Sequence, residues 1–443
     1  MTKNIVYVLI NIVGLGLALA VCIVAYLNYQ FDADFDTCYE NRDRIFRIEH
    51  TQLIEGDPKS FATTPGLLGP AVVDDISGIE KMARVAMDLM SNIQLLKAGE
   101  NEIYTRLIYA DPDFFDIFTF PLIAGNKESF RNYNSIFITE QLAMVLFDNQ
   151  NPVGEIISVW DSPYTVAGII ENHPLNSSFS FKAIVPIHNF YKRNNISEYN
   201  WNQHVASTFI LVGDRKQTEA IEKSLKKYIP VVNDVSWNQV ERFCLAPFRD
   251  MAHNGRTVRD HHFQPSLHPA AVLPPLIAAV CILLIACFNF TNTTIAFAGK
   301  RLKEIGIRKV VGSLKGQLIV QIMGENFMLI FFSLIFAVVF ANYLVPSYSA
   351  MWDFMNLSFS LTKDAELWIF IIILLISTAI ISGAYSAFYI SSFNPVNIFQ
   401  DKLKLGGSNF FSKGILTLQF GITVLALFTG AIFLQNADYQ DKF

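Results

Sequence analysis

Residues 4–36 read NIVYVLINIVGLGLALAVCIVAYLNYQFDADFD, and this stretch indicates the architecture of the chain. Residues 4–29 carry no charged side chain, and about 20 apolar residues suffice to cross the ~30 Å hydrocarbon layer of a bilayer. Asp32, Asp34 and Asp36 follow at once. A signal peptide is an alternative, although its apolar core is only ~7–15 residues long. The run therefore favours a retained membrane helix that leads into a water-exposed domain.

Four further runs have the same character, and Glu325 is the single charged residue inside them: residues 273–297, 318–344, 367–389 and 414–434. Each is long enough to span a bilayer. Within the first run, Gly14 with Ala18 and Gly16 with Ala20 form two pairs of small residues that let a neighbouring helix approach closely. The sequence predicts an α-helical bundle of five membrane helices.

The composition agrees with a membrane protein. Of the 443 residues, 52% are hydrophobic and 16% are charged, whereas soluble domains average about 25% charged residues. The formal net charge of -5 argues against a nucleic-acid binder, and five cysteines without paired spacings argue against a disulfide scaffold or a zinc site. The 38 phenylalanines exclude intrinsic disorder.

Basic residues in the short loops predict the orientation, because loops rich in lysine and arginine stay on the cytoplasmic side. Residues 298–317 contain six basic residues and one acidic residue, and residues 391–413 contain three lysines and Asp401. The loop between these two, 345–366, has one lysine and three acidic residues. This alternation places the N-terminus in the cytoplasm and residues 30–272, with 22 basic and 31 acidic residues, outside.

The external segment predicts an α+β domain of one or two lobes, inserted between the first and second membrane helices. Residues 44–48 and 164–170 are short β-branched or aromatic runs, and 135–139 leads into a helical pattern over 140–146. A second helical pattern covers 218–228.

Candidate chemistry in this domain is sparse. Cys38 and Cys244 both lie outside and leave a disulfide open. A histidine cluster and two carboxylate pairs favour a polar linker, helix caps and turns over a metal site, a pH sensor or a hydrolase. The residues are His261, His262, His268, Asp111 with Asp113, and Asp74 with Asp75.

The loop after the second membrane helix carries the most organised pattern, KRLKEIGIRKVVGSLKGQLIVQIMGE over residues 300–325. Arg301, Glu304 and Arg308 lie near one face of a short helix, with Leu302, Ile305 and Val310 making apolar contacts. Gly312 is the expected helix stop and Ser313 the expected cap of the next helix. Such an elbow could pass a push from a cytoplasmic partner into two membrane helices. Alternatively, it sits on anionic lipid and sets topology.

Glu325 lies inside the third run, where an unpaired charge costs about 2.5–3.5 kcal/mol on insertion scales. The more favoured interpretation places it close enough to the cytoplasmic face to reach water or to hydrogen-bond.

These motifs resemble the MacB/FtsX-type permease subunits of bacterial ABC transporters, in their long form with two repeats. Residues 300–313 resemble the family's K-R-x-K-E-I-G-I-R-K-x-x-G-(A/S) signature, and 287–292 resemble its C-x-N-F-x-N segment. In the external domain, 109–118 and 138–154 are similar to two segments of the family's periplasmic core domain. Residues 382–388 resemble the SGxYPAf segment, with Ser386 where proline is usual.

The resemblance implies a domain layout: membrane helix 4–29, periplasmic core domain 30–272, membrane helix 273–297, cytoplasmic coupling loop 298–317, membrane helices 318–344 and 367–389, an FtsX-like permease domain over 273–400, and membrane helix 414–434 as the start of a second repeat. It also implies that the chain is only the N-terminal half of the long form.

The implied function is that of a permease in the bacterial inner membrane that has no catalytic site and no cofactor. A separate ABC ATPase would push on the loop, and the helices would carry this motion to the external domain for export or extraction of a substrate. The implied ATPase-coupling residues are Lys300, Arg301, Lys303, Glu304, Ile305, Gly306, Arg308, Lys309 and Gly312. In agreement, Ala298-Gly299-Lys300-Arg301 lacks the upstream glycine and the hydroxyl of a phosphate-binding loop.

Other implied partners are a second permease copy or the second half, a periplasmic adaptor or substrate, and membrane lipid, but no nucleic acid. Two other functions stay open at this point. One is a membrane sensor or scaffold that regulates a periplasmic partner such as a cell-wall hydrolase, and the other is an enzyme of the external domain.

Overall fold

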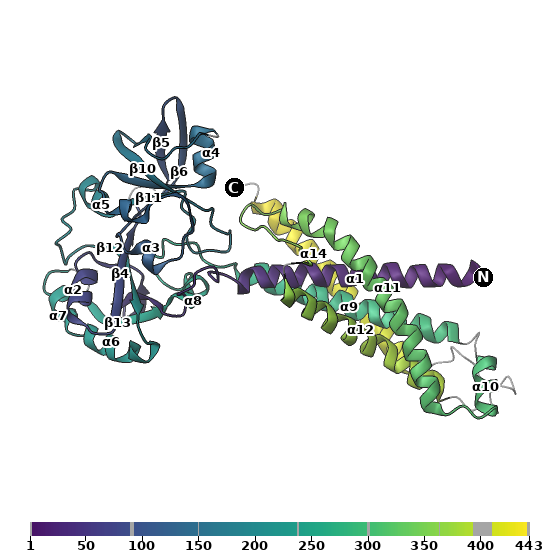
Figure 1. The fold of residues 1–443 in the computed structure, drawn as a ribbon. Helices are drawn as coiled ribbons and strands as arrows, with labels where there is room; N and C mark the ends of the chain where they lie inside the picture. The colour runs from purple at the N-terminus through teal and green to yellow at the C-terminus, as the bar shows by residue number, and fades with distance from the viewer. Residues whose placement is uncertain are drawn as a thin grey trace. The chain divides into compact units, whose positions relative to one another are not determined.

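A computed structural model describes residues 2–88, 93–148, 150–236, 239–298, 302–362, 364–392 and 410–440. The chain divides into two compact units (Figure 1). One, the α+β unit, is Asp32–Leu267, and the other, the helical unit, combines Met1–Phe31 with His268–Phe443.

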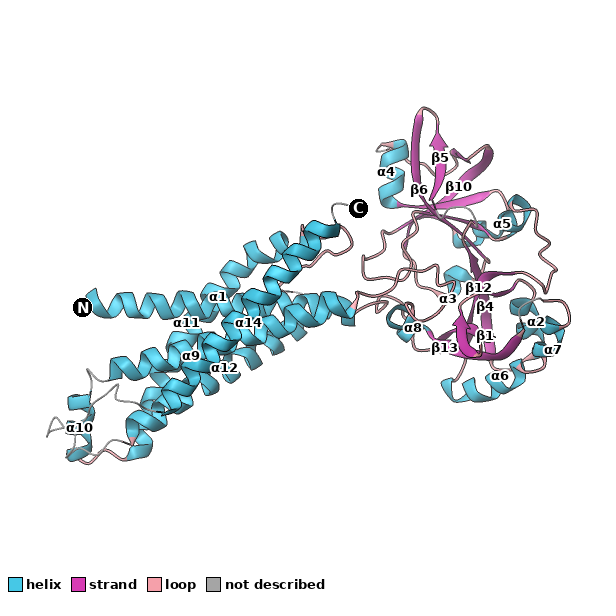
Figure 2. Cartoon of the chain, turned by 180° about the vertical axis from the view of Figure 1, so that it is seen from behind, coloured by secondary structure: helices cyan, strands magenta, loops and turns pink. Residues whose placement is uncertain are grey.

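The helical unit consists of long apolar helices and one short helix (Figure 2). Their bounds are α1 Thr2–Ala33, α9 Pro269–Ala298, α10 Leu302–Val310, α11 Lys315–Ser349, α12 Ala365–Ser391 and α14 Phe410–Gln440. Among the described residues, four helices are long and apolar enough to cross a membrane, namely α1, α9, α11 and α12. The fifth predicted crossing coincides with α14, and its passage through a membrane stays a prediction.

Polar side chains join three of these helices. The Thr291 hydroxyl of α9 donates to the Ser382 carbonyl of α12 over 2.8 Å. The Asn326 amide of α11 donates to the Ser386 hydroxyl of α12 over 3.2 Å. Ser386, which stands where the family pattern has proline, therefore leaves α12 continuous and also accepts an interhelical hydrogen bond. Such bonds between membrane helices are worth about 0.6–2 kcal/mol each.

The two predicted pairs of small residues in α1 differ in their surroundings. A Cβ added at Gly16 would lie 2.5 Å from Cδ1 of Phe336 and 2.9 Å from the Ser333 carbonyl oxygen, both on α11. A Cβ added at Gly14 would have no atom within 4 Å. The close approach of α1 to α11 therefore depends on Gly16.

We expect Gly16→Ala to destabilise the helical unit by about 1–3 kcal/mol, because the new methyl overpacks the α1–α11 contact. Gly14→Ala is the matched control, with a neutral or slightly stabilising effect because alanine is the better helix former. Thermal unfolding of both purified variants in the same detergent measures the difference. Equal melting temperatures for the two variants would contradict the role of Gly16.

Within the described residues of the α+β unit, thirteen strands form one mixed sheet in the order β11-β8-β10-β9-β5-β6-β4-β12-β1-β13, with β2 on β1, β3 on β12 and β7 on β10. β6 pairs with β5, β4 and β11, so it brings the β11 end of the sheet back to its middle and connects this part to β4 and β12. The strands are β1 Ile45–Ile54, β2 Asp57–Phe61, β3 Thr64–Pro65, β4 Ile79–Ala86, β5 Ile93–Ala98, β6 Asn101–Ala110, β7 Leu122–Gly125, β8 Ser135–Thr139, β9 Ile156–Val159, β10 Ser162–Ile170, β11 Ala183–Pro186, β12 His204–Val212 and β13 Val240–Pro247.

Short helices cover the sheet: α2 Leu68–Asp75, α3 Phe114–Ile117, α4 Glu140–Phe147, α5 His188–Arg193, α6 Thr218–Leu225, α7 Tyr228–Asn233 and α8 Phe248–Asn254, with 3₁₀ turns η1 Lys127–Arg131 and η2 Arg215–Gln217. The predicted strand 135–139 and its following helix are confirmed as β8 and α4. The predicted helix 218–228 is too long, because α6 ends at Leu225. Pro230 has no N–H for an i−4 bond, so it fits only the first turn of a new helix, α7.

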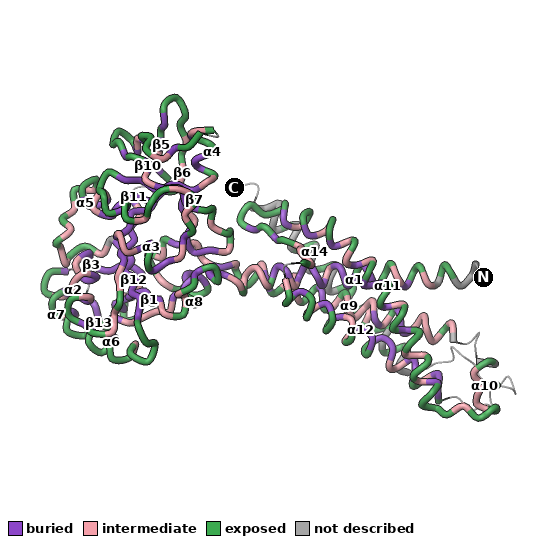
Figure 3. Tube along the Cα trace, viewed as in Figure 1, coloured by how far each residue is buried: buried purple, intermediate pink, exposed green. Residues whose placement is uncertain are grey.

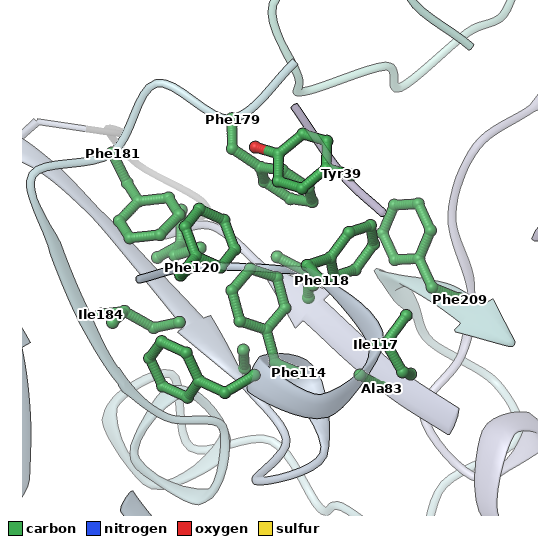
Figure 4. Close-up of a cluster of buried hydrophobic side chains, with 14 of the residues drawn as sticks. Tyr39, Ala83, Phe114, Ile117, Phe118, Phe120, Phe179, Phe181, Ile184 and Phe209 are labelled. Atoms are coloured by element: carbon green, nitrogen blue, oxygen red, sulfur yellow. The ribbon is translucent and has the colours of Figure 1, made fainter. Parts of the chain in front are cut away.

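The centre of the α+β unit is a cluster of aromatic side chains (Figure 4). Phe114 and Phe118, from the turn around α3, both pack against Phe179, and Phe118 also packs against Tyr39 from the start of the unit. All four side chains are almost fully buried. Figure 3 shows buried residues along the strands at the centre of this unit, such as β12. The segment 109–118 that the sequence matched to the family therefore supplies the core of the domain.

Candidate functional site

The short helix α10 and the turn after it form a well-defined elbow. Gly312 has φ +108°, and the Ser313 N–H donates to the Arg308 carbonyl while the Gly312 N–H donates to the Lys309 carbonyl. This is a Schellman motif, so Gly312 ends the helix as predicted. Ser313 does not cap α11, contrary to the prediction. Leu314 takes that position, and its N–H donates to the Gln317 side chain over 3.0 Å because the amide reaches back one turn.

Arg308 connects α10 to the start of α11. Its guanidinium donates to Glu304 over 2.6 Å and to the Gln321 side-chain oxygen, also over 2.6 Å. Gln321 in turn donates to Glu325 over 3.2 Å. The predicted Glu304–Arg308 pair is therefore present, and Glu325 is hydrogen-bonded. A chain of four polar side chains orients α10 against α11.

Lys309 connects α10 to the other end of the α11–α12 hairpin. Its ammonium group donates to the backbone carbonyl of Ser391 over 2.6 Å. Ser391 is the last residue of α12, where carbonyls lack helical partners and the helix dipole favours a cation. Burial, followed by the nearby charge of Lys315, lowers the pKa of Lys309. The elbow is therefore attached to two long helices through adjacent residues of one short helix.

The remaining face of the elbow is apolar and exposed. Ile307, Val310 and Val311 have the i, i+3, i+4 spacing of one helix face, and Leu314 follows the Schellman turn at the N-cap of α11. Their exposed fractions are 54, 68, 82 and 69%. We call these four residues the elbow stripe. Val310 was expected to make apolar contacts, and in the structure its side chain is 68% exposed. Among residues 304–310, whose burial is described, Gly306 is the buried one.

The other predicted coupling residues divide into two groups. Ile305 is half-buried on α10. Lys300 and Arg301 lie outside the described residues, as do Lys402 and Lys404 of the second basic loop, and the side chain of Lys303 is not described either.

The chemical candidates of the α+β unit have structural partners. Cys38 and Cys244 are free thiols. Asp75 accepts from Lys227 and Tyr228. His261 accepts at Nδ1 from Arg47 over 2.8 Å. Among the described residues, no group of three or more histidine, cysteine or acidic side chains could hold a metal ion.

Asp111 belongs to a buried ion-pair network that sequence reasoning missed. Its carboxylate accepts from the Arg84 guanidinium over 2.8 and 2.9 Å and from the Arg84 N–H over 2.8 Å. Arg84 also donates to Glu198 and to the Gly66 carbonyl, each over 2.8 Å. The sequence signal was Asp111 itself, inside a segment rich in phenylalanine, but nothing along the chain identifies Arg84 as its partner.

Two protein-family models match the sequence of this chain. A MacB-like periplasmic core domain matches residues 9–228, and an FtsX-like permease C-terminal domain matches residues 276–395. The chain belongs to the MacB/FtsX family of permeases. This permease is therefore of the ABC-transporter type, and its apolar helices make it a bacterial inner-membrane protein. The elbow lies within the FtsX-like match, and the Phe114 segment lies within the MacB-like match.

Solved structures resemble part of the permease. They are a domain of a Porphyromonas gingivalis protein described as a permease (23% identity, TM-score 0.41, 47% of this chain and 91% of that chain), the extracellular domain of the transporter YknZ from Gram-positive bacteria (14%, 0.33, 45% and 98%), and the periplasmic region of MacB from Actinobacillus actinomycetemcomitans (15%, 0.35, 48% and 94%). No curated protein matches the chain.

Proposed function

We propose that this permease is the membrane-spanning subunit of an ABC transporter that converts ATP-driven motion of a separate ATPase subunit into motion of its periplasmic domain, for export or extraction of a substrate. The elbow carries this proposal. It is a short helix with a fixed end, attached to α11 through Arg308 and to α12 through Lys309. A partner that moves the elbow moves both helices.

The elbow stripe is the surface that the ATPase would grip. The stripe consists of four apolar side chains at one end of the helical unit, and Arg308 and Lys309 border it. Its matching surface on the ATPase would be a groove that is apolar at its base and acidic at its rim. In this proposal the stripe binds, whereas Arg308 and Lys309 hold the elbow in position. Glu304 and buried Gly306 support the helix itself, so Glu304→Arg and Gly306→Leu would act by displacing it.

The proposal includes the predicted topology. The N-terminus and the coupling loop 298–317 lie in the cytoplasm, residues 30–272 lie in the periplasm, and the permease domain covers 273–400. A cytoplasmic reporter fused within 298–317 should be active, and one fused within 30–272 should not. The reverse pattern would remove the elbow from the reach of any ATP-driven partner.

We expect Val311→Asp to reduce recovery of the ATPase with the tagged permease by about tenfold or more, because a charge replaces an 82%-exposed apolar contact at the centre of the stripe. Co-purification from membranes, with the ATPase quantified per permease, is the measurement.

Val145→Asp is the matched control, because Val145 is 49% exposed on α4 of the other unit. It should leave recovery unchanged while it controls for expression and insertion. Full recovery of the ATPase with Val311→Asp would rule out the stripe as the docking surface. An ATPase absent even from the wild-type complex would count against the proposed function as a whole.

A further inference from the structure

The two ends of α12 are both attached to segments that matter for transmission. We infer that α12 is the strut that carries displacement of the elbow to the base of the periplasmic domain, with Lys309 positioning one end and Tyr26 and Gln30 of α1 receiving it at the other. This inference rests on the proposed function and specifies which helix transmits.

The first attachment is at the C-terminal end of α12. The Lys309 ammonium group bonds the Ser391 carbonyl, the last residue of the helix, across a sequence separation of 82 residues. Because a lysine bonded to an unpaired helix carbonyl also neutralises the negative end of the helix dipole, the contact is favourable and directional. A shift of α10 therefore acts directly on the end of α12.

The second attachment is at the N-terminal end of α12. Asp364 is its N-cap, and one carboxylate oxygen accepts from the Glu366 and Leu367 N–H groups. The other oxygen accepts from the Gln30 side chain of α1 over 3.2 Å. Closer to the middle of the two helices, the rings of Tyr26 and Phe370 stack with centroids 4.0 Å apart and planes 8° apart. Gln30 stands two residues before Asp32, where the α+β unit begins.

The helix between these attachments is suited to transmit. It has 27 residues, which is a length of roughly 40 Å at 1.5 Å per residue, and its backbone hydrogen bonds make it stiff along its axis. Its C-terminal half is braced by Thr291 of α9 at Ser382 and by Asn326 of α11 at Ser386. These bonds oppose bending, so a push at Ser391 moves the axis.

A competing route runs through α11. Arg308 bonds Gln321 on α11, and Phe336 and Ser333 of α11 lie against Gly16 of α1. The two routes can be tested separately, because Lys309 and Gln321 are different side chains and because Tyr26 and Gln30 contact α12 through Phe370 and Asp364.

The test uses the full permease with its co-purified ATPase, with and without ATP and vanadate, and measures amide hydrogen exchange over residues 32–44. In Tyr26→Leu/Gln30→Leu, exchange with ATP and vanadate should equal exchange without nucleotide. The ATPase should still bind and hydrolyse ATP at the other end of the helices. Tyr29→Leu, at a side chain that is 49% exposed, should leave the difference unchanged.

At the elbow end, compared per recovered complex, Lys309→Met should abolish the difference, Lys309→Arg should retain it, and Gln321→Leu should also retain it. Loss with Gln321→Leu and retention with Lys309→Met would overturn the inference in favour of α11. Retention in the Tyr26→Leu/Gln30→Leu variant would overturn it as well. A wild-type complex without any nucleotide-dependent change at 32–44 would instead overturn the proposed function, and the inference with it.

Discussion

Acidification from pH 7 to pH 5 is expected to destabilise the α+β unit by several kcal/mol, because four of its histidines are buried in the neutral form. Burial lowers the pKa of His50 and of His261 to about 3, and the pKa of His173 and of His204 to about 4. An unfolded chain binds protons at these side chains near pH 6.5. Below this pH, folding must therefore release these protons from the four imidazoles.

Burial keeps these four imidazoles neutral, and it outweighs the hydrogen bonds that His50 and His173 donate to backbone carbonyls, which favour the protonated ring. His50 donates from Nδ1 to the Thr63 carbonyl over 2.9 Å, and its Nε2 accepts from Gln52 over 2.7 Å. The His204 ring lies edge-on to His50 with centroids 4.7 Å apart, so two charges there would repel. Arg47 donates to Nδ1 of His261, so this nitrogen cannot take up the second proton of the imidazole ring. His173 donates to the Phe181 carbonyl and sits among phenylalanines.

The direction of the four pKa shifts decides whether stability rises or falls with pH. A pKa that is lower in the folded state than in the unfolded state gives stability that is complete above pH 6.5 and is lost as the pH falls toward the folded pKa. The contribution of each histidine to the free energy of unfolding then falls by about 2 kcal/mol between pH 6.5 and 5. For the four histidines together the fall is about 8 kcal/mol. Asp36 opposes this, because burial raises its pKa to about 6 and gives back about 1.4 kcal/mol by pH 5.

His253 also opposes the loss, because its hydrogen bond to Asp32 raises its pKa. The net change of about 6 kcal/mol is comparable to the whole stability of an ordinary domain. Urea unfolding of the full chain at pH 7 and pH 5, read from hydrogen exchange of β1 and β12, measures it.

His204→Phe isolates one of these contributions, because both ring nitrogens of His204 are buried and neither has a hydrogen-bond partner among the described residues. The variant should recover about 2 kcal/mol of the loss at pH 5. His188→Phe, at an exposed histidine that stacks on Tyr133, is the matched control and should not change the loss. Equal stability of the wild-type unit at pH 7 and pH 5 would contradict the argument.

Removal of the Arg84 guanidinium is expected to have the next largest effect. Arg84→Met should destabilise the α+β unit by about 3–5 kcal/mol, because it leaves the carboxylate of Asp111 buried without its partner. The Arg84 and Asp111 side chains are only 5 and 12% exposed. The lost bonds also hold Glu198 and the Gly66 carbonyl, so the ends of β4 and β6 lose their connection to both flanking loops.

The measurement is urea unfolding of the full chain at pH 7, with Lys97→Met as the matched control. Lys97 bonds Glu102 over 2.9 Å, but the two side chains are 47 and 58% exposed, so its loss should leave stability close to that of the wild type. Arg84→Met/Asp111→Leu should be more stable than Arg84→Met alone, because no buried charge remains. A double variant less stable than the single one would show that the charge is not the cause.

The sequence anticipated features that depend on residues close together in the chain. The apolar runs located four long helices, since about 20 uncharged residues must leave water wherever they occur. Glycine at residue 312 predicted the end of α10, because a positive φ suits a residue without Cβ. The segment 135–147 was anticipated as a strand and a helix. The motifs of both domains indicated the family that the two matches establish.

The same reasoning failed where a side chain depends on a partner far away in the chain. Val310 was expected to make apolar contacts and is 68% exposed, because helical spacing shows which residues share a face but not which face is covered. The contacts Lys309 to Ser391 and Gln30 to Asp364 join residues 82 and 334 positions apart. The neutral histidines and Arg84 likewise owe their state to burial, which no local pattern reports.

Membrane insertion, helix ends and family membership therefore follow from the order of residues along the chain, because polarity and backbone preference are local properties. Which helix the elbow holds, which glycine touches a neighbour and which charges lie out of water follow from the packed chain. Hydrogen-bond partners and solvent exclusion exist only once distant segments meet.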